Sequence, residues 1–261
     1  MSDSTTFRQR VRRLVLPIYK PSRSVLLPSF PKSLLLRPMI FECWYRLRAL
    51  RYVWFGGGIR TLNEFGEIVP RAAMDRVSSY NKSRIWEFFR DRTEKLIAIV
   101  HCIDAVPRTA KVLVIGPRNE AEILLLSLYG FDLGNITGLD LFTYSPLIRL
   151  GDMHDIQFPN DTFDVVFSAW TLAYSYDLKK ACAEIIRVAK PGAIVATGMS
   201  HTSTQSDLDL SAITAGGVRE LVDAFDPHVE HVYWQESSPV RGGEAAEVSI
   251  VFRVGKKRHV H

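Results

Sequence analysis

Long uninterrupted apolar runs are absent from this chain of 261 residues. A helix that crosses a bilayer needs about 18 or more consecutive apolar residues, so the sequence predicts no membrane-spanning helix. The start of the chain also lacks the compact apolar segment and the small-residue cleavage site of a secretory signal. Its Arg-rich composition is shared by organelle transit peptides, but prolines interrupt any long amphipathic helix there. We therefore expect neither kind of targeting peptide.

Cysteine is scarce, and the three that occur, Cys43, Cys102 and Cys182, are far apart. No C-x-x-C pair is present, so the sequence suggests neither a disulfide framework nor a zinc site, and we expect no metal. A reducing, cytoplasmic setting is the simplest interpretation. The glycine triplet at 56–58 lacks the Lys-Ser/Thr ending of a phosphate-binding P-loop, so we expect a turn or hinge.

Acidic residues are nearly missing from residues 1–60, which hold two acids against twelve Lys or Arg, a net charge of +10. The whole chain carries +5, so residues 61–261 carry −5. The basic character therefore belongs to an N-terminal arm. Such an arm predicts attraction to an anionic membrane surface or to an acidic partner.

Residues 1–106 read as a basic, proline-rich arm followed by a largely helical extension. The segment 41–55, FECWYRLRALRYVWF, has aromatic and aliphatic side chains at helical spacing. We expect this helix to dock on the core or on a second subunit, which allows a homodimer. A peripheral membrane helix and an aromatic-basic nucleic-acid surface are the alternatives. Residues 71–106 also show helical apolar spacing, up to the proline at 107.

Residues 107–261 alternate strand and helix patterns, which predicts an α/β domain. We expect strands near 111–115, 136–140, 147–150, 163–169, 192–198, 229–235 and 247–254, and helices near 119–129, 177–189 and 215–224. The last two strands suit an antiparallel hairpin at a sheet edge. The predicted fold is a Rossmann-like, mostly parallel sheet with an antiparallel final strand and helices on both faces.

Two stretches carry a resemblance to a known family. GDMHDIQFPNDTFDVVFSAW, at 151–170, has an acid turn followed by an F-P-x-D-x-F-D-V-V block. EIIRVAKPGAIVATG, at 184–198, has a helix-to-strand turn of the form E-x-x-R-V-x-K-P-G. Together they resemble the class I S-adenosylmethionine-dependent methyltransferases of type 11, over about residues 95–255. The resemblance implies S-adenosylmethionine as cofactor.

The resemblance also implies cofactor contacts. Asp140 ends the second strand, where a carboxylate accepts both ribose hydroxyls. Asp152 corresponds to the acid that accepts the adenine amino group, and the Met153 N–H would reach a ring nitrogen. Met153 and Phe142 would flank the adenine, although either side chain could instead be plain core. Gly116 allows a close backbone approach. The remaining expected cofactor contacts are Leu141 and Ser168.

The glycine loop departs from the family pattern of acid-x-Gly-x-Gly-x-Gly. Only Gly116 remains, while Val114, Arg118 and Glu120 stand at the positions of the acid and the later glycines. We expect a rebuilt site in which Arg118 pairs with the methionine carboxylate and Glu120 accepts from its ammonium. A helix cap at Asn119 with Glu120 at the helix dipole is a compatible alternative.

The link between Asp140 and Asp152 is about half the length that is usual in the family, which places a helix and a strand there. The segment FTYSPLIRLG contains Pro146 and has no room for both. We therefore expect the helix to be missing or reduced to a turn. The adenine side would then be open unless the N-terminal extension covers it.

The segment after the fourth strand lies where the methyl group would face an acceptor. Trp170, Tyr174 and Tyr176 could shape that pocket. His201, beyond the fifth strand, is the best general-base candidate, since imidazole takes a proton near neutral pH. His154 is a weaker one. An ordinary loop histidine is the alternative for His201, and positioning alone can accelerate methyl transfer.

Four functions remain open at this point, and one of them, transfer of the aminocarboxypropyl group of the cofactor, is selected by no feature of the sequence. The leading hypothesis is methyl transfer to an oxygen or nitrogen of a small-molecule, sugar or lipid-like acceptor, with residues 1–106 as a lid, acceptor wall or dimer surface. A non-catalytic methyltransferase-like scaffold would explain the altered glycine loop. An RNA or DNA methyltransferase would use the basic arm as a phosphate track, but S-A-W-T replaces the N-P-P-Y loop of base-flipping enzymes.

Overall fold

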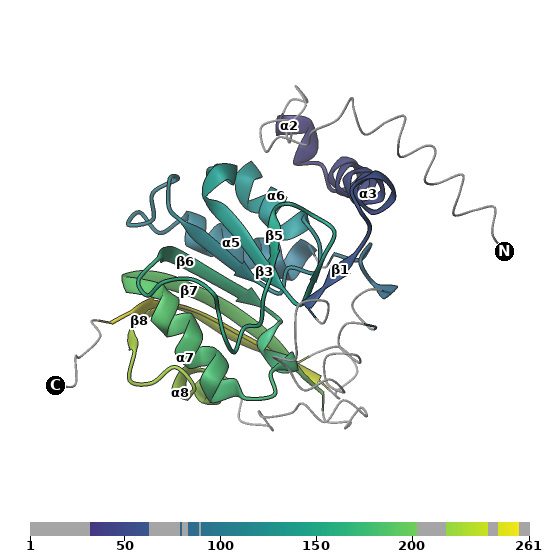
Figure 1. Cartoon of the computed structure of the whole chain (residues 1–261). Helices are drawn as coiled ribbons and strands as arrows, with labels where there is room; N and C mark the ends of the chain where they lie inside the picture. Colours follow the sequence, from purple (N-terminus) through teal and green to yellow (C-terminus); the bar gives the residue numbers. More distant parts are fainter. Residues whose placement is uncertain are drawn as a thin grey trace.

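A seven-stranded sheet forms the centre of the molecule (Figure 1). The computed structural model describes residues 32–62, 79, 83–88, 90–202, 218–239 and 245–255. The strand order is β5 (Ile148–Leu150), β3 (Ile136–Asp140), β2 (Val112–Ile115), β6 (Phe163–Ala169), β7 (Ala189–Thr202), β9 (Ala245–Val254) and β8 (Val229–Pro239). The first five strands are parallel, and β9 runs antiparallel to both β7 and β8. The predicted fold class is confirmed.

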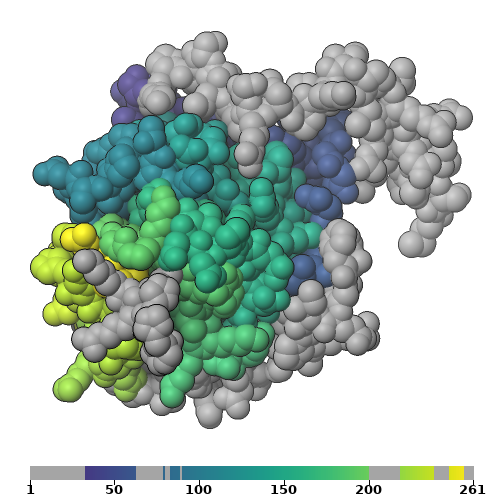
Figure 2. Space-filling view, turned by 60° about the vertical axis from the view of Figure 1, so that its left-hand side comes forward, coloured from purple at the N-terminus to yellow at the C-terminus, as the bar shows by residue number. Residues whose placement is uncertain are grey.

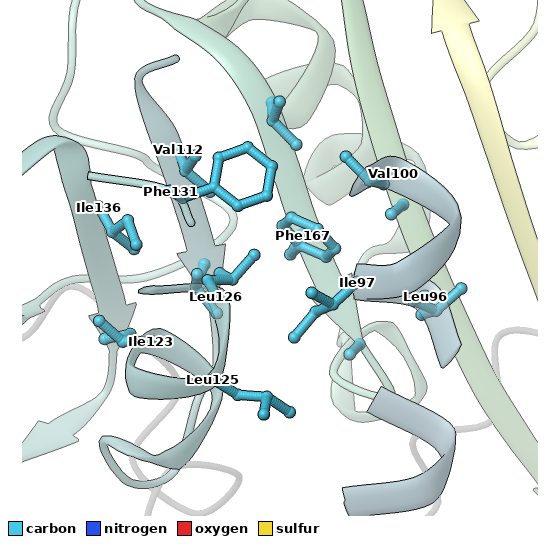
Figure 3. Close-up of a cluster of buried hydrophobic side chains, with 14 of the residues drawn as sticks. Leu96, Ile97, Val100, Val112, Ile123, Leu125, Leu126, Phe131, Ile136 and Phe167 are labelled. Atoms are coloured by element: carbon cyan, nitrogen blue, oxygen red, sulfur yellow. The ribbon is translucent and has the colours of Figure 1, made fainter. Parts of the chain in front are cut away.

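The central strands are buried on both faces, which explains their continuous apolar runs. All four residues of β2 are buried. Their side chains alternate between two hydrophobic clusters, with Val112 and Val114 in one and Leu113 and Ile115 in the other. Figure 3 shows the first cluster between the sheet and two helices. The sheet is therefore the middle layer of three.

Helices cover both faces of this sheet. The first cluster contains side chains of α5 (Arg90–His101) and α6 (Ala121–Leu128). The second contains side chains of α7 (Leu178–Val188) and α8 (Val218–Asp223). Short 3-10 turns, η4 (Leu133–Asn135) and η5 (Leu172–Tyr174), precede β3 and α7.

The N-terminal extension contributes α2 (Lys32–Leu35) and α3 (Pro38–Phe55). A proline begins α3, where the missing N–H costs no helical hydrogen bond. Phe41 and Tyr45 on one face of α3 are fully buried in the first cluster. The Tyr45 hydroxyl donates to the Trp86 carbonyl at 2.8 Å. The expectation that segment 41–55 forms a helix docked on the core is confirmed.

The link from β3 to β5 contains no helix, as predicted. It instead holds the short strand β4 (Phe142–Thr143), which pairs antiparallel with β1 (Arg60–Thr61) of the extension. The Leu62 N–H donates to the Leu141 carbonyl at 2.9 Å, and the Leu62 side chain packs against Leu141 and Leu150. The N-terminal extension therefore covers the edge that the missing helix leaves open.

Several predicted boundaries are wrong, and one of them is the end of β8, which lies at Pro239 rather than at 235. Within the helical region expected over 71–106, residues 79 and 83 are helical and α5 ends at His101, before the proline at 107. Residues 71–78, 80–82 and 89 lie outside the described residues. Strand β7 continues to Thr202, because it pairs with β9 from Ile194 to Thr202. The domain boundary at 106/107 stays a prediction. No described helix is both long and apolar enough to span a bilayer.

Candidate active site

The candidate site lies at the carboxyl ends of three neighbouring strands. After β2 the chain passes through α6 to β3, which pairs with one side of β2. The later strand β6 pairs with the other side of β2. Strand order therefore reverses at β2, and open α/β sheets bind ligands at such a reversal. Gly116, Asp140 and Trp170 follow or end these three strands.

Gly116 is held in a left-handed conformation, with φ of 65°. Its N–H donates to the Leu139 carbonyl at 2.8 Å. A Cβ at this position would lie 2.3 Å from Cγ2 of Thr171. The Thr171 hydroxyl donates to the Ile115 carbonyl at 2.9 Å, so this contact ties the loop after β2 to the loop after β6. The absence of a side chain at Gly116 therefore lets Thr171 pack closely against the backbone of this loop.

Asp140 is buried at the end of β3. One carboxylate oxygen accepts from the Arg118 N–H at 3.0 Å, and the other accepts from the Phe142 N–H at 3.4 Å. Burial raises the pKa of this carboxyl to about 6, because these backbone hydrogen bonds compensate only part of the lost hydration. The side chain therefore lies beside the glycine loop, where burial disfavours its ionised form.

A second buried acid, Glu122, was missed by the sequence analysis. It lies in the first turn of α6, and its carboxyl accepts from the Thr93 hydroxyl at 3.4 Å. Burial raises the pKa of Glu122 to about 8, although Arg118 and Arg92 oppose the shift and Asp140 adds to it. The available signal was a lone acid in the apolar run AEILLLSL, in which residues 121–127 are all buried.

Glu122 predicts a pH-dependent stability. A carboxyl whose pKa is higher in the folded state favours the folded protein at low pH, and that contribution is lost as pH rises through the folded pKa. We expect the free energy of unfolding to fall by about 2 kcal/mol between pH 6.5 and pH 8.5. Urea unfolding of Glu122→Gln over the same range should lack this decline. An equal decline in both proteins would show that Glu122 does not titrate there.

Glu120, predicted to accept from the cofactor ammonium, has other partners in the structure. Its fully buried carboxylate accepts from Arg48 through Nε at 2.8 Å and Nη2 at 3.2 Å. The Ser145 hydroxyl donates to it as well. The structure supports the alternative of a helix cap at Asn119, because the Ala121 N–H donates to Asn119 Oδ1 at 2.9 Å. Glu120 anchors α3 to α6.

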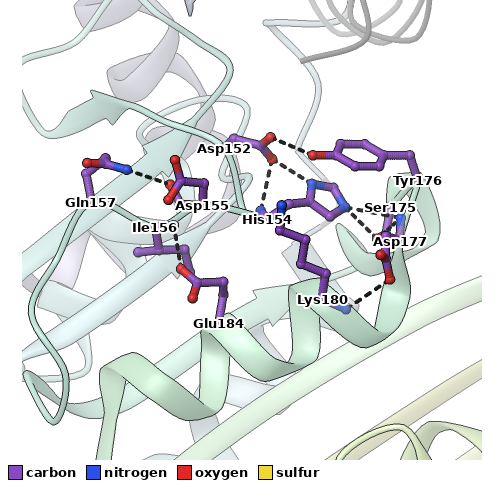
Figure 4. A network of polar contacts seen from close by, with 10 residues as sticks. All are labelled: Asp152, His154, Asp155, Ile156, Gln157, Ser175, Tyr176, Asp177, Lys180 and Glu184. Atoms are coloured by element: carbon purple, nitrogen blue, oxygen red, sulfur yellow. Dashed lines mark hydrogen bonds and ion pairs between the residues drawn. The ribbon is translucent and has the colours of Figure 1, made fainter. Parts of the chain in front are cut away.

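Asp152 belongs to a buried polar network, shown in Figure 4. Its Oδ1 lies 2.6 Å from Nδ1 of His154, and the His154 Nε2 lies 2.7 Å from the Ser175 hydroxyl. The Tyr176 hydroxyl donates to Asp152 Oδ2 at 3.1 Å, and the Tyr176 ring stacks on the imidazole with centroids 3.6 Å apart. Burial alone would raise the pKa of Asp152, but the hydrogen bonds and charge interaction with His154 and the hydrogen bond from Tyr176 together outweigh burial and lower it.

The predicted adenine neighbours divide into core and partly exposed residues. The Phe142 ring is buried in a cluster with Ala49, Ile85 and Tyr144, so the core alternative holds for it. Met153 is half-buried against the second cluster. Leu141 packs against Leu62 of the extension. Phe142 is therefore not an adenine-flanking residue in this structure.

The acceptor side begins at Trp170, which has the rare backbone φ of 55°. Its N–H donates to the Gly198 carbonyl at 2.6 Å, and the Arg92 guanidinium lies 4.5 Å from the centre of its ring. Non-glycine residues in this conformation cost roughly 1–3 kcal/mol and concentrate at functional sites. Tyr174 is half-buried one turn later, whereas Ser168 is fully buried within β6.

His201 lies within β7, opposite Ala246 of β9, rather than beyond the strand as expected. Its side chain lies outside the described residues. A general-base role for His201 stays a prediction.

Comparison with known proteins identifies the central segment. The family model described as "Methyltransferase domain" matches residues 115–197. Residues 115–197 are a methyltransferase domain. The class I methyltransferase prediction is thereby confirmed for this domain, which includes every predicted cofactor residue from Gly116 to Ser168. His201 lies outside the matched segment.

A curated relative and two solved structures are similar to this chain. The malonyl-[acyl-carrier protein] O-methyltransferase of Serratia marcescens is 30% identical over 76 residues, which are 29% of this chain and 25% of the relative. The match therefore spans about a quarter of that relative's length.

The structural likeness concerns the fold alone, at low identity. A Haemonchus contortus phosphoethanolamine N-methyltransferase 2 gives a TM-score of 0.54 at 13% identity, covering 74% of this chain and 62% of that one. A putative sarcosine dimethylglycine methyltransferase from Galdieria sulphuraria gives 0.51 at 15% identity, covering 83% and 99%. Both structures share the fold of this chain.

Proposed function

We propose that the chain transfers a methyl group from S-adenosylmethionine to an oxygen or nitrogen of a small-molecule, sugar or lipid-like acceptor. The observation that carries this proposal is the buried Asp140 carboxylate at the end of β3, beside the Arg118 N–H in the glycine loop. It lies in the methyltransferase domain, at the point where the strand order reverses.

The donor and acceptor groups fit such a cofactor. Asp140 and Glu122 are buried carboxyls whose pKa values are raised by burial, so hydroxyl or cationic partners would stabilise their ionised forms. Asp140 would accept from the ribose hydroxyls. Glu122, in place of Glu120, would accept from the ammonium group, and Arg118 would pair with the carboxylate.

The adenine would lie at the acid turn after β5. Asp152 would accept from its amino group and the Met153 N–H would donate to its ring. The Tyr176 hydroxyl now donates to Asp152 Oδ2, so it would have to yield that oxygen to the ligand. Tyr176 is 37% exposed, which leaves its side chain room to turn outward.

The bound cofactor supplies an electrophilic methyl group with a neutral thioether as leaving group. The chain's own residues bind its ends, exclude water with the Trp170 ring, and orient the acceptor beside Tyr174. His201 would hold the proton released by an acceptor hydroxyl or ammonium. Orientation accounts for much of the acceleration in such a displacement.

A methyl-transfer assay tests the proposed acceptor class. The full chain would be incubated with methyl-labelled S-adenosylmethionine and three sets of acceptors: small metabolites with carboxyl, hydroxyl or amino groups, bulk tRNA, and duplex DNA. We expect labelled products from the small-molecule set only, and none with heat-denatured protein. Label entering tRNA or DNA alone would overturn the small-molecule proposal.

A non-catalytic scaffold is the second candidate, because Arg48 already binds Glu120 and Tyr176 already binds Asp152. These contacts fill two of the positions at which the resemblance places cofactor contacts. The two candidates differ in cofactor binding. A scaffold of this kind would give no heat on titration with S-adenosylhomocysteine, whereas the proposed enzyme would bind it.

A further inference from the structure

Helix α3 is apolar on two opposite faces. Phe41, Tyr45 and Ala49 are buried against the core. A second row of apolar side chains follows the outer face at spacings of three and four residues, which place them on one side of a helix. This outer stripe consists of Met39, Cys43, Leu47, Leu50 and Trp54.

The outer stripe is exposed over its whole length. Met39 is 82% exposed and Leu47 is 65% exposed, while Leu50 and Trp54 are 41% and 64% exposed. Part of α3, in blue, is visible at the molecular surface in Figure 2. Exposed apolar side chains scattered singly are ordinary, but a contiguous row of them marks an interaction surface.

Arginines flank the outer stripe on both sides. At 3.6 residues per turn, Arg46 and Arg51 lie on opposite borders of the stripe, and both are exposed. Arg37 is exposed just before α3 begins. Glu42, paired with Arg46 at 3.1 Å, is the lone acid between residues 32 and 60. The surface is therefore an apolar row with positive borders.

We infer that the outer stripe docks on an anionic lipid surface, with α3 lying in the plane of the interface. Apolar side chains enter the acyl boundary while arginines on the borders reach the lipid phosphates. Positive charge on the rest of residues 1–60 adds attraction to the same surface. The inference does not depend on the proposed catalytic function.

A second copy of the chain fits the outer stripe less well. Two stripes packed together would place the bordering arginines of both copies side by side, with Glu42 as the available counter-charge on each. Like charges facing each other across an interface oppose association. Lipid headgroups supply the negative charge that residues 32–60 of a second copy, with Glu42 as their one acid, provide only once.

Vesicle flotation tests this docking with the full chain. The probes are vesicles of phosphatidylcholine alone and vesicles with about 30% phosphatidylserine. We expect binding to the anionic vesicles and a loss of binding at high salt. Met39→Ser/Leu47→Ser should weaken binding about tenfold or more. Tyr233→Ser, an exposed aromatic change on β8, and Arg219→Gln, an exposed charge change on α8, are the matched controls and should bind like the parent.

The native cysteines give a positional test. Cys43 lies in the outer stripe, Cys102 is exposed after α5, and Cys182 is buried. A fluorophore on Cys43 in a Cys102→Ser background should be quenched by brominated lipids in anionic vesicles. The same fluorophore on Cys102 in a Cys43→Ser background should not be.

Each outcome decides the inference. Binding that requires phosphatidylserine and the outer stripe, with quenching at Cys43 alone, supports it. No binding to anionic vesicles overturns it, as does binding that Met39→Ser/Leu47→Ser leaves unchanged. A lipid-independent dimer in sedimentation equilibrium that the same double variant dissociates would assign the stripe to a second copy instead.

Discussion

Asp140→Asn is expected to weaken S-adenosylhomocysteine binding about 100-fold or more, since it removes charge-assisted hydrogen bonds to both ribose hydroxyls. The variant should remain folded. Burial raises the pKa of Asp140 from 3.8 to about 6, so its ionised form costs about 3 kcal/mol of stability at neutral pH. Asn removes that cost and keeps one acceptor for the backbone donors. Its free energy of unfolding at pH 7.5 should equal or exceed that of the parent.

Calorimetry and urea unfolding together check this expectation. Asp164→Asn is the matched control, because Asp164 is paired with Lys190 near the opposite end of β6. It should bind the ligand like the parent. Unchanged affinity in Asp140→Asn would exclude Asp140 as the ribose ligand. Weaker binding together with lower stability would instead point to a structural role.

Arg48→Met is expected to destabilise the protein by about 3–5 kcal/mol, because it leaves the Glu120 carboxylate buried without its charge partner. Arg48 donates two hydrogen bonds to a carboxylate that is fully inaccessible to solvent. The Ser145 donor would remain, but one hydroxyl does not replace a guanidinium. Thermal and urea unfolding measure the loss.

Two variants control for this result. Arg46→Met removes the partner of Glu42, and both of those side chains are about half exposed, so the cost should stay below about 1 kcal/mol. The double variant Arg48→Met/Glu120→Gln removes both charges and should recover much of the stability. A loss below about 1 kcal/mol in Arg48→Met alone would show that the buried ion pair contributes little.

Much of the fold was predictable because local patterns and global structure agree. Apolar runs identified all seven strands of the main sheet, and the order of strand and helix identified the parallel part of the sheet. The short Asp140–Asp152 segment correctly predicted a missing helix, since the ten residues of FTYSPLIRLG include a proline and leave no room for both a helix and a strand. Asp140 was placed at a strand end by its sequence position alone, and the structure places it there.

The details that sequence could not supply depend on residues far apart in the chain. Arg48 and Glu120 are 72 residues apart, so nothing local showed that Glu120 would be buried against α3. The pairing of β1 with β4 also joins residues far apart in the chain, and the ring of Phe142 in β4 is buried in the core. Glu122 was overlooked because an acid in a helix usually faces solvent, and only the packing of α5 on α6 shows that this one is buried.

The central claim is that this methyltransferase domain binds its cofactor at the carboxyl ends of β2 and β3. Calorimetric titration of the full chain with S-adenosylhomocysteine at pH 7.5 tests it most directly. We expect saturable binding with one ligand per chain, and the loss of that binding in Asp140→Asn but not in Asp164→Asn. If folded parent protein gave no binding heat at about 1 mM ligand, the binding free energy would be weaker than about 4 kcal/mol. That result would contradict the proposed cofactor site.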